Sequence, residues 1–248
     1  MQVVVNNLLT NYVQKGSGKN VLLLHGWGDS SKGMHLFIEA LAKKYKVTSI
    51  DLPGFGGTQA PSEAWSVSDY AGFVQQFAYK IGLEPALVIG HSNGGAIAIR
   101  ALSGGLVADK LVLVASAGIR GEYKGRMQIL RYITKAGKAI AMLLPKRIQK
   151  KLRRKLYTTV GSDMLVAEHL QETFKKVVAD DVRQAASTLT VPTLLIYGDN
   201  DVSTPLVFGR KLEQAIPNSR LEVIPGGEHG LPTENTQQVI NLIKGFDR

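Results

Sequence analysis

One stretch, residues 86–105 (ALVIGHSNGGAIAIRALSGG), constrains the fold of this chain more than any other. It opens with an apolar run without period, which is typical of a strand buried on both faces, and continues from Ala96 with helical spacing. Between the two lies Gly90-His91-Ser92-Asn93-Gly94, a G-x-S-x-G sequence at the predicted strand-to-helix turn. Such a turn presents the Ser92 hydroxyl at the end of the strand, and the Asn93 amide begins the helix beside it. The alternative is an ordinary glycine-rich turn.

The rest of the chain alternates apolar strands with helical stretches, which predicts parallel βαβ units. The sequence therefore favours an α/β fold with a mostly parallel, doubly wound sheet. Strands are expected at residues 21–24, 47–50, 86–90, 111–115, 191–197 and 220–224, and helices at 33–45, 66–81, 205–216 and 234–246. Residues 8–14 are expected to form an edge strand, or a hairpin with residues 15–19 as its turn.

Two glycine-containing turns follow the first two buried strands. His25-Gly26-Trp27-Gly28 follows residues 21–24, and its Trp27 amide is a candidate oxyanion donor together with the Asn93 amide. The alternative is a plain glycine turn with Trp27 as packing. Residues 51–57 (DLPGFGG) follow the next strand, and Asp51 is expected to make turn hydrogen bonds rather than act as a catalytic acid.

A serine nucleophile needs a histidine base, and the imidazole needs a carboxylate that orients it. Asp201 and His229 follow two later strands, so Ser92, Asp201 and His229 are each expected at the carboxyl end of a strand. Asp199 is the main alternative acid. Among the other histidines, His25 and His91 lie in glycine turns that they are expected to support, and His35 and His169 lie in helical stretches. No cluster has metal-ligand spacing.

On these motifs the chain resembles the α/β-hydrolase superfamily, in particular serine esterases and lipases with a helical cap. The matching motifs are H-G-x-G at residues 25–28, D-x-P-G-x-G at 51–56, the nucleophile turn at 90–95 and G-x-x-D at 198–201. The resemblance implies Ser92 as nucleophile, Asp201 as acid and His229 as base, with backbone amides of Trp27 and Asn93 as oxyanion donors. It also implies substrate contacts from His25, Trp27 and Phe55, and no cofactor or metal. Relatives commonly carry Met, Leu, Gln or Phe where this chain has Asn93, whose polar side chain could add a substrate contact.

The resemblance further implies a core formed by residues 1–117 and 189–248, with a cap inserted at 118–188. Residues 120–183 hold sixteen Lys/Arg against six Asp/Glu, so this segment carries the whole surplus of the +10 net charge. Within it, residues 143–157 have helical apolar spacing with a basic face. Three interpretations stay open: a solvated cap helix, a contact with anionic lipid, and steering of acidic substrates or weak nucleic-acid contact. Aromatic residues do not alternate with the basic ones in this segment, as they would in a surface that stacks bases, so no nucleic-acid partner is expected.

Composition limits the chemistry and the cellular location that can be expected. The 248 residues include no cysteine, which excludes disulfides and a cysteine nucleophile, and neither a signal peptide nor a membrane span is evident, so a cytoplasmic enzyme is expected. The expected activity is hydrolysis of a small-molecule carboxylic ester through an acyl-enzyme. The alternatives are C–C bond hydrolysis or cofactor-free perhydrolysis on the same three residues, or a non-catalytic lipid-surface protein that uses the basic cap. The substrate and the oligomeric state stay open.

Overall fold

The computed structural model of the chain describes residues 1–120 and 168–248. Residues 1–119 and 172–248 form one compact unit, and residues 120–171 form a second. Residues 118–119 and 172–188, which the resemblance assigns to a cap at 118–188, group with the first unit, and the cap itself stays a prediction. The basic helix expected at 143–157 lies outside the described residues.

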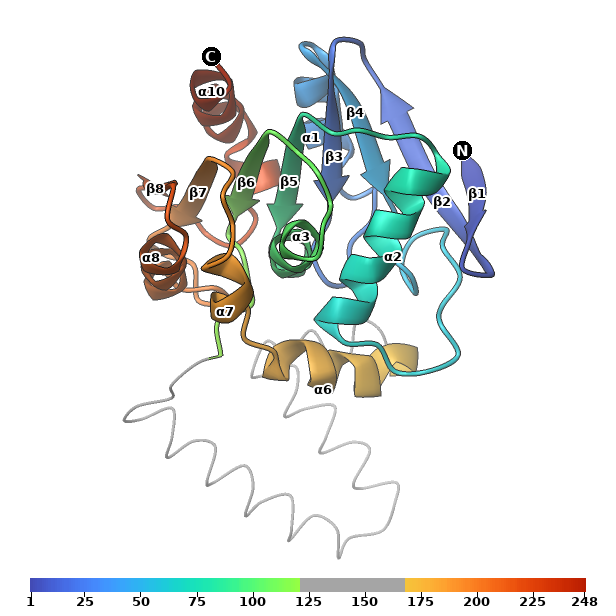
Figure 1. Cartoon of the computed structure of the whole chain (residues 1–248). Coiled ribbons are helices and arrows are strands. Elements are labelled where there is room, and N and C mark those ends of the chain that lie inside the picture. The colour runs from blue at the N-terminus through green and yellow to red at the C-terminus, as the bar shows by residue number, and fades with distance from the viewer. Residues whose placement is uncertain (121–167) are drawn as a thin grey trace, which may run out of the picture. The chain divides into compact units, whose positions relative to one another are not determined.

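An eight-stranded sheet runs through the first unit (Figure 1). Its spatial order is β1-β2-β4-β3-β5-β6-β7-β8, and the six strands from β3 to β8 run parallel to one another, which confirms the predicted mostly parallel sheet. The strands are β1 (Gln2–Val5), β2 (Leu8–Lys15), β3 (Lys19–Leu24), β4 (Tyr45–Ile50), β5 (Leu87–His91), β6 (Lys110–Val114), β7 (Thr193–Gly198) and β8 (Ser219–Ile224).

The amino-terminal end of the sheet is a hairpin of β1 and β2. Asn6 and Asn7 join the two strands with positive φ angles of 47° and 63°, a conformation that asparagine tolerates better than most residues. Strand β2 also pairs antiparallel with β4, so β1 is the edge strand at this end. Residues 8–14 do belong to a hairpin, but their partner is β1. The expected turn at residues 15–19 is wrong, because these residues lead to β3, which does not pair with β2, and the expected edge strand is wrong as well.

Helices cover both faces of the sheet (Figure 1). The helices of the described residues are α1 (His35–Ala42), α2 (Val67–Lys80), α3 (Asn93–Ser103), α6 (Gln171–Ala179), α7 (Arg183–Ala186), α8 (Leu206–Ala215), α9 (Leu231–Glu234) and α10 (Thr236–Phe246), and Glu168–Leu170 form a 3₁₀ turn. Helices α1, α9 and α10 pack on one face, and α2, α3 and α8 lie on the other. The sheet is therefore doubly wound, as predicted.

The buried apolar residues explain why these segments hold together. Phe37 and Leu41 of α1 and Val239 and Ile243 of α10 join one buried cluster with the strand residues that face them, such as Ile89. Helix α2 begins as predicted: Ser66 caps it, since its side chain accepts from the N–H of Asp69 and the Asp69 carboxylate accepts from the N–H of Ser66. Burial on both faces leaves the carboxyl ends of the parallel strands as the edge where polar groups gather.

Within the described ranges, 1–120 and 168–248, no helix combines the length and apolar character that a membrane crossing requires.

Candidate active site

Ser92 occupies the turn between β5 and α3. Its φ is +52°, a left-handed conformation that a residue with a side chain adopts only when its surroundings enforce it. Two backbone hydrogen bonds to the end of β6 do so: the Ser92 N–H donates to the Val114 carbonyl at 3.0 Å, and the Ala117 N–H donates to the Ser92 carbonyl at 2.9 Å. The strained turn directs the hydroxyl away from the sheet, as the G-x-S-x-G pattern predicts.

The glycines around Ser92 are required by close backbone packing. A Cβ atom on Gly94 would lie 2.3 Å from the carbonyl oxygen of Leu24, and one on Gly90 would lie 2.5 Å from the carbonyl oxygen of Gly94. Neither space admits a methyl group, because both obstacles are backbone atoms. Strand β3, the turn and the start of α3 can therefore approach one another only with glycine at these positions.

Three distant side chains meet at this edge. The Nε2 atom of His229 lies 3.0 Å from the Ser92 hydroxyl, and its Nδ1 atom lies 2.8 Å from Oδ2 of Asp201. Asp201 follows β7 and His229 follows β8, so both come from the carboxyl ends of parallel strands, like Ser92 (Figure 1). The Asp201 side chain is fully buried, whereas that of His229 is 30% exposed. With Nδ1–H donating to the carboxylate, Nε2 is left to accept the hydroxyl proton.

Asp201 is held as a carboxylate. Burial by itself would raise its pKa, but hydrogen bonds from His229 and from the N–H and hydroxyl of Thr204 outweigh burial and lower the pKa. The alternative acid, Asp199, lies elsewhere: its carboxylate accepts from the Gly226 N–H at 2.6 Å and so stabilises the turn after β8. The structure brings Asp201, not Asp199, to the imidazole.

Two further histidines, His91 and His25, make hydrogen bonds to backbone groups of the loops around the site. The buried His91 places its Nε2 atom 3.0 Å from the carbonyl oxygen of His229, and burial lowers its pKa to about 4, with the nearby His229 adding to the effect. His25 is completely buried: its Nδ1 lies 2.7 Å from the Gly26 carbonyl, and its Nε2 accepts from the Leu52 N–H at 2.9 Å. Burial also lowers the pKa of His25. The geometry thus favours a supporting role for His25 over the substrate contact expected from the sequence.

The loop after β3 lies against Ser92. A Cβ atom on Gly26 would be 3.2 Å from Cβ of Ser92, so the Gly26-Trp27 backbone runs directly beside the serine. On the other side, Asn93 is the first residue of α3, where N–H groups have no partner inside the helix. The two candidate oxyanion amides, of Trp27 and Asn93, thus belong to segments that flank the Ser92 side chain.

An aromatic cluster extends from this loop. The Trp27 ring centroid lies 4.9 Å from that of Phe55 and 5.1 Å from that of Phe174 in α6. Trp27 and Phe55 were expected near the substrate, but the sequence did not single out Phe174. Its only signal is the helical spacing of Phe174, Val177 and Val178. Thr204 was missed as well, although it follows Asp201 by three residues and precedes Pro205.

The Asn93 side chain is unusual because both its polar atoms are buried without a hydrogen-bond partner among the residues that the structure describes. It is 3% exposed, and neither Oδ1 nor Nδ2 has a hydrogen bond within the described parts of the chain. An unsatisfied buried amide is costly, so the position is not explained by stability. Whether this side chain adds a substrate contact stays a prediction.

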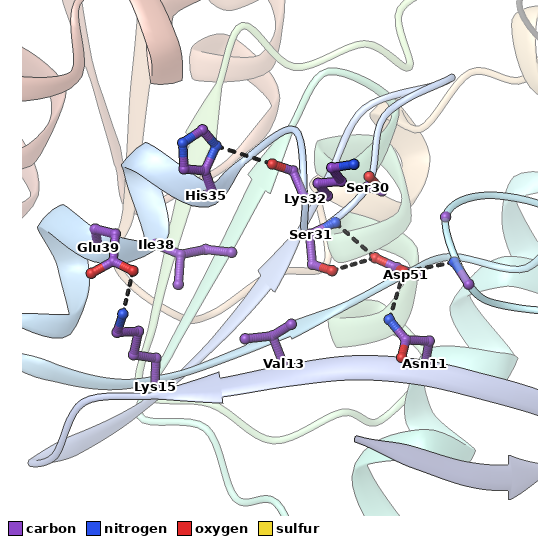
Figure 2. A pocket seen from close by; sticks show the side chains of 12 residues that line it. Asn11, Val13, Lys15, Ser30, Ser31, Lys32, His35, Ile38, Glu39 and Asp51 are labelled. Atoms are coloured by element: carbon purple, nitrogen blue, oxygen red, sulfur yellow. Dashed lines mark hydrogen bonds and ion pairs between the residues drawn. The ribbon is translucent and has the colours of Figure 1, made fainter.

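Asp51 makes turn hydrogen bonds, as predicted. Its carboxylate accepts from the N–H groups of Ser31 and Gly57 at 2.7 and 2.9 Å and from the Asn11 amide at 2.8 Å (Figure 2). Burial would raise its pKa, but these bonds lower it. A cavity of about 610 Å³ opens beside it between β2 and α1, and neither Ser92 nor His229 lines this cavity (Figure 2).

His35 and His169 lie in helical segments, as the sequence indicates: His35 begins α1, and His169 lies in the turn at 168–170. In the described part of the chain, no three His, Cys, Asp or Glu residues are grouped in a way that could hold a metal ion.

Comparison with known proteins shows which family the chain resembles. The model of the alpha/beta hydrolase family matches residues 21–242. The chain is 28% identical to the AB hydrolase superfamily protein YisY of Bacillus subtilis, over 93% of this chain and 92% of that protein. It is 25% identical to a pimeloyl-[acyl-carrier protein] methyl ester esterase of Aeromonas hydrophila, over 93% of this chain and 96% of the esterase.

The fold is also that of solved structures. A bacterial membrane phospholipase A superposes with a TM-score of 0.79 at 21% identity, covering 99% of this chain and 84% of that one. At this identity the likeness concerns the fold alone, and the fold hosts many reactions. The choice of reaction therefore depends on the residues at the site.

Proposed function

The chain belongs to the α/β-hydrolase family, and on this premise we propose that it is a serine hydrolase that cleaves carboxylic esters with Ser92, His229 and Asp201. One observation carries the proposal: the Ser92 hydroxyl, the His229 imidazole and the Asp201 carboxylate form a continuous hydrogen-bonded series of 3.0 and 2.8 Å. A hydroxyl that faces an acceptor nitrogen, backed by a carboxylate on the other ring nitrogen, is the arrangement that activates serine for attack on a carbonyl.

The first half of the reaction forms an acyl-enzyme. The Ser92 oxygen attacks the ester carbonyl carbon while its proton passes to Nε2 of His229. The imidazolium that results is stabilised by the Asp201 carboxylate at Nδ1. The carbonyl oxygen becomes an oxyanion, for which the amides of Trp27 and Asn93 are the proposed donors. The tetrahedral intermediate collapses as the C–O bond breaks, and Nε2–H returns the proton to the leaving alcohol.

The second half releases the acid. Water takes the place of the alcohol and gives a proton to Nε2 as its oxygen attacks the acyl carbon. Collapse of this second intermediate breaks the bond to Ser92, which regains its proton from His229, and frees a carboxylic acid. The chain's own residues account for every proton moved, and losing one oxyanion donor typically costs about 10² to 10³ in rate.

Two features support an ester with an apolar acyl group. One relative of similar length carries the name of a methyl ester esterase. The rings of Trp27, Phe55 and Phe174 also form an apolar wall that starts at the proposed oxyanion loop. Such a wall suits a hydrocarbon chain better than a charged group.

The test is covalent labelling with a fluorophosphonate probe, followed by a panel of p-nitrophenyl esters of increasing acyl length. The protein is expected to label and to hydrolyse at least one ester, and Ser92→Ala should abolish both. Ser103→Ala, which removes an exposed hydroxyl from the same helix α3, should leave both unchanged. Absence of labelling in the folded protein would overturn the proposal. Labelling without ester hydrolysis would instead point to a different reaction of Ser92, such as C–C bond hydrolysis or perhydrolysis.

A further inference from the structure

The two oxygens of Asp201 are held in different ways. Oδ1 accepts from two backbone N–H groups of its own loop, those of Ser203 at 2.8 Å and Thr204 at 2.9 Å. Oδ2 is the oxygen that faces the imidazole, and besides Nδ1 of His229 its neighbour is the Thr204 hydroxyl at 2.7 Å. Backbone donors therefore hold Oδ1, whereas the donors at Oδ2 are two side chains, the His229 imidazole and the hydroxyl of Thr204, a buried residue that is 4% exposed.

The Thr204 hydroxyl has three polar neighbours. Besides Oδ2 of Asp201, its oxygen lies 3.1 Å from Nδ1 of His229 and 2.9 Å from the carbonyl oxygen of Ala115. A hydroxyl has one proton to donate and can accept through its lone pairs. The carbonyl and the carboxylate can only accept, so the proton points to one of them at a time, while a lone pair faces the Nδ1–H of His229.

The acceptor at Ala115 is held in place by the backbone. Ala115 follows the last residue of β6 and has a φ of +45°, a region that alanine disfavours. It is fully buried, its N–H donates to the Ile196 carbonyl at 2.8 Å, and its own carbonyl accepts from Thr204. Strain of this kind persists where the surroundings over-determine it, and here it coincides with a carbonyl directed at the loop that carries Asp201.

We propose that Thr204 is a positioning residue for the reaction of Ser92: its hydroxyl donates its proton to Oδ2 of Asp201 and holds this oxygen against Nδ1 of His229, with the Ala115 carbonyl as the alternative acceptor. This inference rests on the proposed function. Thr204 touches neither the substrate nor Ser92 in this scheme and acts through the Asp201 carboxylate and Nδ1 of His229. Its hydroxyl matters when Nε2 takes the serine proton, because the carboxylate must then stay in contact with the imidazolium.

The test compares variants that separate the hydroxyl from packing. Thr204→Val keeps the β-branched shape without the hydroxyl, and Thr204→Ser keeps the hydroxyl. Thr193→Val is the matched control, because Thr193 is equally buried at the opposite end of β7 and its hydroxyl donates to the Val191 carbonyl at 3.1 Å. For the ester that the protein hydrolyses best, Thr204→Val should lower kcat about 10- to 100-fold with little change in KM. Thr204→Ser should restore kcat to within about threefold, and Thr193→Val should stay within about twofold of the unmodified protein.

A second measurement does not depend on activity. The downfield proton resonance of a His Nδ1–H bonded to a carboxylate should appear in the unmodified protein and in Thr204→Ser, and should be lost or shifted in Thr204→Val. If the unmodified protein neither labels nor hydrolyses, the proposed function fails, but this resonance still tests what Thr204 does. The proposal about Thr204 is overturned if Thr204→Val leaves the resonance and kcat unchanged, or if Thr204→Ser is as impaired as Thr204→Val. Should Thr204→Val not fold, Thr204→Ala removes the hydroxyl without adding a methyl group, and the same criteria apply.

Discussion

The imidazole of His91 contacts the backbone of His229. Its Nε2–H donates to the His229 carbonyl oxygen at 3.0 Å, and the two rings lie 5.2 Å apart in a tilted arrangement. His91 immediately precedes Ser92 in the chain. His91 therefore holds the loop of His229, and the imidazole of His229 contacts Ser92. The contact needs a proton on Nε2, which the neutral imidazole can carry, and burial with the adjacent His229 lowers the pKa of His91 to about 4, so the ring is neutral near pH 7.

This buried neutral histidine predicts a pH-dependent stability. His91 gains a proton below about pH 6.5 when unfolded but only near pH 4 when folded, so the unfolded state binds more protons between these values. The free energy of unfolding should therefore fall as the pH is lowered from 6.5 to 4.5, and His91 should contribute about 2 to 3 kcal/mol of that fall. Urea unfolding at both pH values measures it. His91→Phe should show a smaller fall; an equal fall in the two proteins would contradict the assignment.

The two aspartates of the loop after β7, Asp199 and Asp201, offer a matched test of which carboxylate the reaction uses. Asp201→Asn should lower kcat by about 10⁴, because an amide at this position favours the wrong imidazole tautomer. Asp199→Asn should leave kcat within about threefold, because Asp199 bonds to the Gly226 N–H rather than to His229. Steady-state hydrolysis of one p-nitrophenyl ester by both variants decides the matter. Similar losses in both variants would show that the loop as a whole, and not the Asp201 carboxylate, is what the reaction needs.

The sequence predicted those parts of the fold and the site that depend on local pattern. Ser92, Asp201 and His229 each follow an apolar run, and parallel strands bring such positions to one edge, so their meeting could be expected. Strand β1 was missed because it is only four residues long and its turn is Asn-Asn, a weaker signal than Asn-Gly.

Other features depend on contacts that no local pattern encodes. Phe174 reaches Trp27 across 147 positions of the chain only after α6 has docked. The proposed role of Thr204 involves the carbonyl of Ala115, a residue with a strained backbone at the end of a different strand. The supporting role of His25 follows from its contact with the Leu52 N–H, whereas the motif by itself suggested a substrate contact as well.

Close packing at the nucleophile turn predicts a sharp difference between two glycines. Gly94→Ala should destabilise the protein by about 1 to 3 kcal/mol and reduce activity, because the new methyl group would overlap the carbonyl oxygens of Leu24 and His25. Gly245→Ala is the control: it lies in α10 with open space around it, so alanine should stabilise the helix by about 0.5 to 1 kcal/mol. Thermal or urea unfolding of both variants gives the comparison. Unchanged stability and activity in Gly94→Ala would mean that the backbone at the end of β3 can move to make room for the methyl group.

The contact between Trp27 and Phe174 predicts how the protein selects acyl chains. If the rings of Trp27, Phe55 and Phe174 form the wall of the acyl site, Phe174→Ala should raise KM for longer p-nitrophenyl esters by about 10-fold and leave p-nitrophenyl acetate nearly unaffected. Val178→Ala, which trims an exposed residue of the same helix α6, should change neither. Equal losses of kcat for acetate and for longer esters would instead show that Phe174 steadies the Trp27 loop, since an acetyl group is too short to need the wall but still needs the oxyanion donor.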